Sequence, residues 1–272
     1  MSTPEFPDNS PTPEREPSGK TWGFYELQTR VVDIYEAHDR ECGYGPDTMI
    51  VKLLGNAEVL KRIARRKPDD IQALDQALTN VLIWTATFAN AARTPIQSIL
   101  LEKYGNGCQR CRQIPCVMTH GQECVDSPNF LGTKPEKTPE SLGEWQAHLA
   151  AIYPNNFLQG ADEALKMTTE RVLDEIVELA SSTHQDIERE LSPLSRHRNH
   201  EDKAFPWKGE IADVLAWSFG VAEVLRRRTN GEYSVETSLK EKYSESCPYC
   251  KHPQCGCPKE VTVIDDLSKG LN

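Results

Sequence analysis

The stretch that decides the fold is residues 170–216, ERVLDEIVELASSTHQDIERELSPLSRHRNHEDKAFPWKGEIADVLA, which carries two pairs of carboxylates at the same spacing. Glu175 and Glu178 form an E-x-x-E pair, and Glu210 and Asp213 form an E-x-x-D pair. Residues three apart lie on one face of a helix, roughly 5–6 Å apart at Cβ. Each pair can therefore direct two carboxylates at one point, and two antiparallel helices would bring all four together.

Four carboxylates in one cleft repel one another unless some are protonated or a cation lies among them. Oxygen ligands suit Mg²⁺ or Mn²⁺, with water and substrate phosphates completing the coordination shell. The alternative is a solvated helix face, on which a single E-x-x-E pair is common. The chain therefore presents either a divalent-metal site or two acidic surfaces.

The apolar positions on these two helices favour the metal site. At about 100° per residue, Glu175 falls at the edge of one apolar arc, and Glu210 borders the other. Trp217 shares the face of Asp213, which indicates a covered cleft and makes Trp217 a candidate substrate contact. The arcs consist of Leu165, Thr169, Val172, Ile176, Leu179 and Ala180 on the first helix and Ile211, Val214, Leu215, Ser218, Ala222 and Leu225 on the second.

Composition limits the class of protein. The chain has 272 residues, of which 38% are hydrophobic and 26% charged, and its net charge of −10 disfavours a nucleic-acid polymer as partner. No apolar run approaches the ~20 residues that span a bilayer, and the N-terminus lacks the apolar core of a secretory signal. We expect a cytoplasmic protein without membrane contact, whose nine cysteines are metal ligands or free thiols rather than disulfides.

Helical periodicity without any convincing strand predicts an all-α fold. Residues 1–20 and 259–272 are expected to be tails, the first of them disordered, and residues 127–141 a linker. The expected helices cover residues 25–38, 49–66, about 70–92, 95–104, 142–153, about 161–191, 210–228 and 235–243.

The two halves of the chain look like copies of one another. FYELQTRVVDIY (24–35) matches LGEWQAHLAAIY (142–153), and VLIWTATFANAA (81–92) matches VLAWSFGVAEVL (214–225). Glu-Lys-Tyr followed by Cys-x-x-Cys-x4-Cys also occurs in both halves. We therefore predict two domains, residues 21–126 and 142–258, each ending in a cysteine-rich segment.

The first copy lacks the four carboxylates. In the alignment, Glu175 and Glu178 stand opposite Asn56 and Val59, and Glu210 and Asp213 stand opposite Ala77 and Asn80. The packing positions are retained, because Leu78, Val81, Leu82, Thr85, Phe88 and Ala89 repeat the apolar arc of residues 211–222. This contrast predicts one active and one inactive site.

The second copy resembles the MazG-like all-α nucleotide pyrophosphohydrolases. The resemblance rests on LDEIVELA (173–180) and EIADVLAW (210–217), on the Ile152-Tyr153 ending of the preceding helix, and on the cysteine-rich ending CPYCKHPQCGC. It implies that all four carboxylates are catalytic and bind Mg²⁺ or Mn²⁺, and that a nucleoside triphosphate is hydrolysed to the monophosphate and pyrophosphate. It also makes self-association through helix packing plausible.

Two cysteine clusters have the spacing of structural zinc sites. Cys247, Cys250, Cys255 and Cys257 supply four sulfurs within eleven residues. The first copy has Cys108, Cys111 and Cys116, to which His120 or Cys124 could add the fourth ligand. Free thiols or disulfides are the alternatives.

Cationic residues near the acidic motifs are candidate phosphate contacts, although a solvated surface is the better explanation for any one of them. They are Lys166, Arg171, Arg196, Arg198, Lys203 and Lys208. Two other classes compete with the enzyme: a non-catalytic nucleotide-binding or regulatory module, and a zinc-stabilised interaction protein.

Overall fold

The computed structural model describes residues 21–116, 124, 137–158, 160–191 and 206–258, and within these ranges every regular element is helical. The helices are α1 (Phe24–Cys42), α2 (Pro46–Arg66), α3 (Ile71–Ala91), α4 (Ile96–Tyr104), α5 (Leu142–Ile152), the 3₁₀ helix η1 (Pro154–Phe157), α6 (Ala161–Leu191), α7 (Pro206–Arg228) and α8 (Val235–Tyr243). The predicted all-α class is confirmed for these ranges. Among these helices, none has the length and apolarity needed to cross a bilayer.

Polar residues at the helix starts explain most of the boundaries. The Ser141 hydroxyl accepts a hydrogen bond from the Glu144 N–H at 3.1 Å, and the Glu144 carboxylate accepts one from the Ser141 N–H. The Asp70 carboxylate caps α3 by accepting a hydrogen bond from the Ala73 N–H at 3.0 Å. α7 begins at Pro206 rather than at the expected Glu210, because proline suits the first turn, where its missing N–H leaves no bond unmade.

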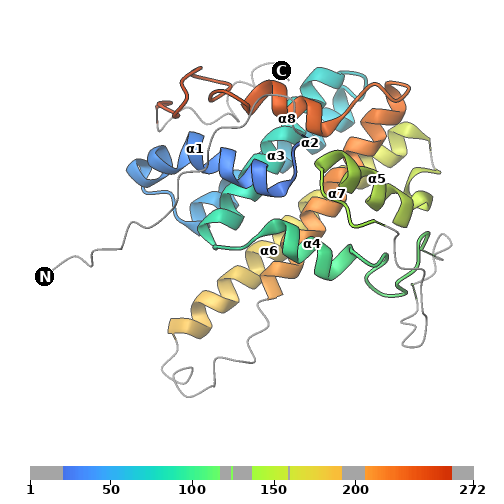
Figure 1. The fold of residues 1–272 in the computed structure, drawn as a ribbon, viewed down its shortest axis with the longest axis horizontal. Helices are drawn as coiled ribbons and strands as arrows, with labels where there is room; N and C mark the ends of the chain where they lie inside the picture. The colour runs from blue at the N-terminus through green and yellow to red at the C-terminus, as the bar shows by residue number, and fades with distance from the viewer. Residues whose placement is uncertain (1–20, 117–123, 125–136, 159, 192–205, 259–272) are drawn as a thin grey trace, which may run out of the picture.

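The core lies between α2, α3, α6 and α7, with α1, α4, α5 and α8 packed around them (Figure 1). The predicted apolar arcs face this core. Leu165, Val172 and Ile176 on α6 are fully buried. Ala180 is the only residue of the α6 arc that is half-buried. Every arc position of α7 and of α3 is buried as well. Helices from both halves of the sequence thus share one hydrophobic core.

The short helices and cysteine segments cross between the two halves. α4, from the first half, packs on α7, and α8, from the second half, packs on α3. The Cys116 N–H donates to the Ile152 carbonyl at 2.7 Å, and the Cys255 N–H donates to the Ile34 carbonyl at 2.7 Å. The sequence comparison pairs Cys116 with Cys255 and Ile152 with Ile34, so the two bonds are equivalent in the two halves. Each cysteine segment therefore covers helices of the opposite half.

Candidate functional site

Three of the four predicted carboxylates converge. Glu175 and Glu178 on α6 and Glu210 on α7 each offer a carboxylate oxygen, and these oxygens lie within 4.8 Å of one another. The three-residue spacing places the α6 pair on one face, and the packing of α6 on α7 brings Glu210 to it. Glu175 and Glu210 are half-buried, whereas Glu178 is exposed. We call these three residues the acidic triad.

Asp213 lies beside the acidic triad but is held by α4. Its carboxylate accepts a hydrogen bond from the Tyr104 hydroxyl and forms an ion pair with the Lys103 ammonium. Lys103 also donates to the Gly209 carbonyl at 3.0 Å. The spacing of the carboxylates did not predict that Lys103 and Tyr104 would contact Asp213. The only sign in the sequence was that Glu-Lys-Tyr occurs in both halves.

Burial and like charge perturb the acidic triad. Burial, together with the charges of Asp213, Glu178 and Glu210, raises the pKa of Glu175 to about 7. Trp217 opposes this shift, because its indole N–H donates to Glu175 Oε1 at 3.1 Å and favours the carboxylate. Burial and the charge of Asp213 also raise the pKa of Glu210. The site carries more negative charge than its surroundings neutralise, as expected of a place for a cation.

A cavity of about 480 Å³ opens beside these residues. Glu175, Asp213 and Trp217 line it, together with other residues of α6 and α7 and with residues of α4, α5, η1 and the first cysteine segment. Its volume lies in the range of small-molecule sites, about 300–1,000 Å³. Glu175 and Asp213 therefore face a space large enough for an organic ligand.

The predicted cationic contacts are only partly brought together. Arg171 lines the cavity, as does Arg110, which sequence reasoning missed. Lys166 is exposed on α6, outside the cavity wall, and the Lys208 ammonium lies 5.8 Å from the Trp207 ring. The other three candidates, Arg196, Arg198 and Lys203, lie outside the described residues.

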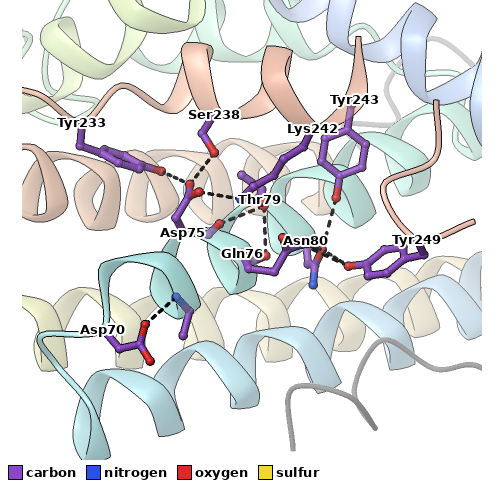
Figure 2. A network of polar contacts seen from close by, with 11 residues as sticks. Asp70, Asp75, Gln76, Thr79, Asn80, Tyr233, Ser238, Lys242, Tyr243 and Tyr249 are labelled. Carbon is purple, nitrogen blue, oxygen red and sulfur yellow. Dashed lines mark hydrogen bonds and ion pairs between the residues drawn. The ribbon is translucent and has the colours of Figure 1, made fainter. Parts of the chain in front are cut away.

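A second and much smaller cavity, of about 60 Å³, occupies the corresponding place in the first half. Asn56, Asn80 and Trp84 line it, at the positions aligned with Glu175, Asp213 and Trp217. The Tyr249 hydroxyl donates to Asn80 Oδ1 at 2.8 Å, as Figure 2 shows, and Tyr243 contacts the same oxygen at 3.3 Å. Amides thus replace carboxylates here, and a tyrosine occupies part of the space.

The polar network around this smaller cavity joins α8 to α3. Asp75 accepts hydrogen bonds from Tyr233 at 2.9 Å and from Ser238 at 2.6 Å, and it pairs with Lys242 at 2.6 Å (Figure 2). The ion pair gives Asp75 a local counter-charge. These contacts therefore hold α8 against α3.

The first cysteine cluster consists of Cys108, Cys111, Cys116 and Cys124, all buried. Neighbouring sulfurs lie 3.6–3.8 Å apart. A tetrahedral ion with ligands at ~2.3 Å requires sulfurs about 3.8 Å apart, so the geometry fits zinc. Cys124 is in position to supply a fourth ligand, whereas His120 lies outside the described residues.

The second cluster consists of Cys247, Cys250, Cys255 and Cys257, and three of these are only half-buried. The sulfurs of Cys247 and Cys257 lie 3.9 Å apart. A hydrogen bond from Cys255, aided by backbone N–H groups, lowers the pKa of Cys247 to about 4 against the effect of burial. Each of the two clusters can hold a metal such as zinc.

Comparison with protein-family models, curated proteins and solved structures finds no match to this chain. The function is therefore argued from the acidic triad, its cavity and the two cysteine clusters.

Proposed function

We propose that the protein is a Mg²⁺-dependent nucleoside triphosphate pyrophosphohydrolase whose active site is the acidic cavity. The observation that carries this proposal is the convergence of three carboxylates within 4.8 Å, one of which, Glu175, lines a cavity of about 480 Å³ together with Asp213. Burial and the neighbouring carboxylates raise the pKa of Glu175 to about 7, which disfavours its charged form as long as no cation is bound. A divalent ion bridging protein carboxylates and substrate phosphates would supply positive charge there.

The residues fit Mg²⁺. Octahedral coordination at 2.0–2.1 Å separates adjacent ligand oxygens by about 2.9 Å and opposite ones by about 4.1 Å. The three carboxylates, within 4.8 Å of one another, need only small rotamer changes to reach these separations. Mg²⁺ bound there would offset phosphate charge and lower the pKa of a coordinated water. Mn²⁺ suits the same ligands.

The chain's own residues set the geometry. Trp217 holds Glu175 by a hydrogen bond, and Lys103 and Tyr104 hold Asp213 at the wall of the cavity. With Mg²⁺ bound, the Asp213 carboxylate would act beside the metal ligands as a fixed anion, or would join them if Lys103 moved to a substrate phosphate.

The two halves are proposed to be tandem MazG-like bundles, residues 21–126 and 142–258, of which the first has lost catalysis. The paired contacts at Cys116 and Cys255 support duplication, and the contrast between cavities of about 480 and about 60 Å³ supports one active site. The first half then takes the place of a dimer partner. Free cysteine thiols suit the reducing cytoplasm, where we place the protein.

A screen of nucleoside triphosphates with Mg²⁺, following pyrophosphate release, tests the proposal. We expect turnover by the wild-type chain and none by Glu175→Gln or Asp213→Asn, whereas Glu170→Gln, an exposed change on α6, should retain activity. Full activity of either site variant would refute the assignment. Binding without turnover would indicate a regulatory nucleotide-binding protein, and neither binding nor turnover a zinc-stabilised scaffold.

A further inference from the structure

The loop between Cys108 and Cys111, the first two cysteines of the first cluster, forms part of the wall of the acidic cavity. Cys108, Gln109, Arg110, Cys116 and Cys124 all line this cavity. The sulfurs of the first cluster therefore anchor the wall that faces the carboxylates of the other half. A structural metal bound to this cluster would fix part of the cavity wall.

Arg110 is the cation that this loop presents. Its side chain is exposed, and it makes no ion pair with any residue that the structure describes. Arg171, the other arginine of the cavity wall, already lies 3.7 Å from Asp174. Of the two arginines that line the cavity, Arg110 is thus the one that has no carboxylate partner among the described residues.

The second cysteine cluster shows how far a side chain from this loop position reaches. Tyr249 follows Cys247 by two residues, as Arg110 follows Cys108, and its hydroxyl lies 2.8 Å from Asn80. Asn80 aligns with Asp213. A side chain at position 110, comparable in length to tyrosine, can therefore extend to the vicinity of the Asp213 carboxylate.

The two loops share a backbone conformation, which supports the comparison. Arg112 and Lys251 both have positive φ, 55° and 61°, four residues after the first cysteine. Their N–H groups donate to the carbonyls of Cys108 and Cys247 at 2.8 and 2.9 Å. Position 110 thus stands in its loop as position 249 stands in the other.

We propose that this loop is the phosphate-binding wall of the acidic cavity, with Arg110 contacting the phosphate chain of the substrate and the metal of the first cluster holding the loop in place. Guanidinium binds phosphate oxygens through two parallel hydrogen bonds. The substrate would lie between the metal on the acidic triad and Arg110 opposite. The identity of this ligand as a polyphosphate rests on the proposed function.

The test measures the affinity of a non-hydrolysable nucleoside triphosphate analogue, with Mg²⁺, by titration calorimetry. A charged hydrogen bond to phosphate corresponds to roughly 10- to 100-fold in affinity, so Arg110→Gln should raise the Kd by about that factor. Arg65→Gln, an exposed change on α2 with the same loss of charge, should leave the Kd unchanged. An Arg110→Gln variant that binds as tightly as the wild type would overturn the proposal.

A second pair of variants separates the loop from general stability. Cys111→Ser removes a ligand of the first cluster without touching the cavity wall, and Cys250→Ser removes one from the second cluster. We expect weaker analogue binding for Cys111→Ser alone. Equal binding of the analogue by the two folded variants would overturn the role of the first cluster. If Cys111→Ser does not fold, the analogue affinity of Arg110→Gln decides whether the loop binds phosphate.

The proposed function and this inference can fail separately. Wild-type turnover with an unchanged Arg110→Gln variant would leave the function standing and remove the inference. Analogue binding that Arg110→Gln weakens, without turnover of any triphosphate, would remove the function and leave the inference. A wild-type chain that binds no analogue would refute both.

Discussion

Replacing Glu175 by glutamine should stabilise the protein in the absence of divalent cations and destabilise it relative to the wild type in their presence. The raised pKa means that the folded state holds the proton more tightly than the unfolded chain. The stability contribution of Glu175 is therefore greatest below pH 4.5 and is lost as the pH rises through about 7. A neutral amide avoids this loss and still accepts the hydrogen bond from Trp217.

The magnitude follows from the pKa difference. A pKa of about 7 instead of 4.5 corresponds to about 3 kcal/mol, at 1.36 kcal/mol per pKa unit. Because Glu175 is only half-buried, solvent screening reduces this to about 1.5 kcal/mol. For a chain of this size, the melting temperature at pH 8 should rise by about 3–6 °C.

The assay is thermal unfolding of wild type, Glu175→Gln and the exposed control Glu170→Gln at pH 5 and pH 8. Divalent ions are removed by resin rather than by a chelator, so that the cysteine clusters keep their metal. We expect equal melting temperatures at pH 5 and a higher one for Glu175→Gln at pH 8. With millimolar Mg²⁺ the order at pH 8 should reverse, since the wild type gains the binding energy of the ion. A lower melting temperature for Glu175→Gln in metal-free buffer at pH 8 would refute the electrostatic reasoning.

Three further results are expected. The affinity of the wild-type chain for Mg²⁺, measured calorimetrically, should increase as the pH rises from 6 to 8, because Glu175 must lose its proton; a flat profile would contradict this. Lys103→Met removes the counter-charge of Asp213, so it should bind Mg²⁺ more tightly and unfold more easily, whereas Lys242→Met, which breaks only the pair with Asp75, should lower stability alone. Metal analysis should find two zinc ions per chain, and Cys124→Ser should lose one of them; a full complement in that variant would exclude Cys124 as a ligand.

Sequence periodicity was sufficient for the helices and the core. The apolar arcs of α3, α6 and α7 are buried as predicted, because a 3.6-residue repeat leaves one face for packing. α8 spans the expected residues 235–243, set by the Ser234 cap at its start. The sequence did not predict the start of α7 or the short η1 helix, both of which begin at a proline. A proline can begin a helix or end one, so it indicates a helix start only when the residues after it are known to be helical.

The candidate site was predictable only in its local part. Spacing within one helix placed Glu175 and Glu178 together, and pairing with Glu210 required only that α6 pack against α7. Lys103, Tyr104 and Arg110 lie more than sixty residues before the acidic motif, and their approach depends on how the two halves exchange segments. Hydrophobic periodicity does not show which segments are exchanged. The repeated Glu-Lys-Tyr nevertheless includes Lys103 and Tyr104, which contact Asp213 of the other half.

The exchange of cysteine segments has a consequence for biosynthesis. The Cys255 N–H bonds to Ile34 across more than two hundred residues, so this part of α1 stays uncovered until the second cysteine segment has been synthesised, although α3 and α4 can pack on the helix before then. Contacts of such long sequence separation slow folding, and the exposed apolar face invites association with other nascent chains. Translation rate and chaperone supply should therefore govern the soluble yield of this protein more strongly than its final stability does.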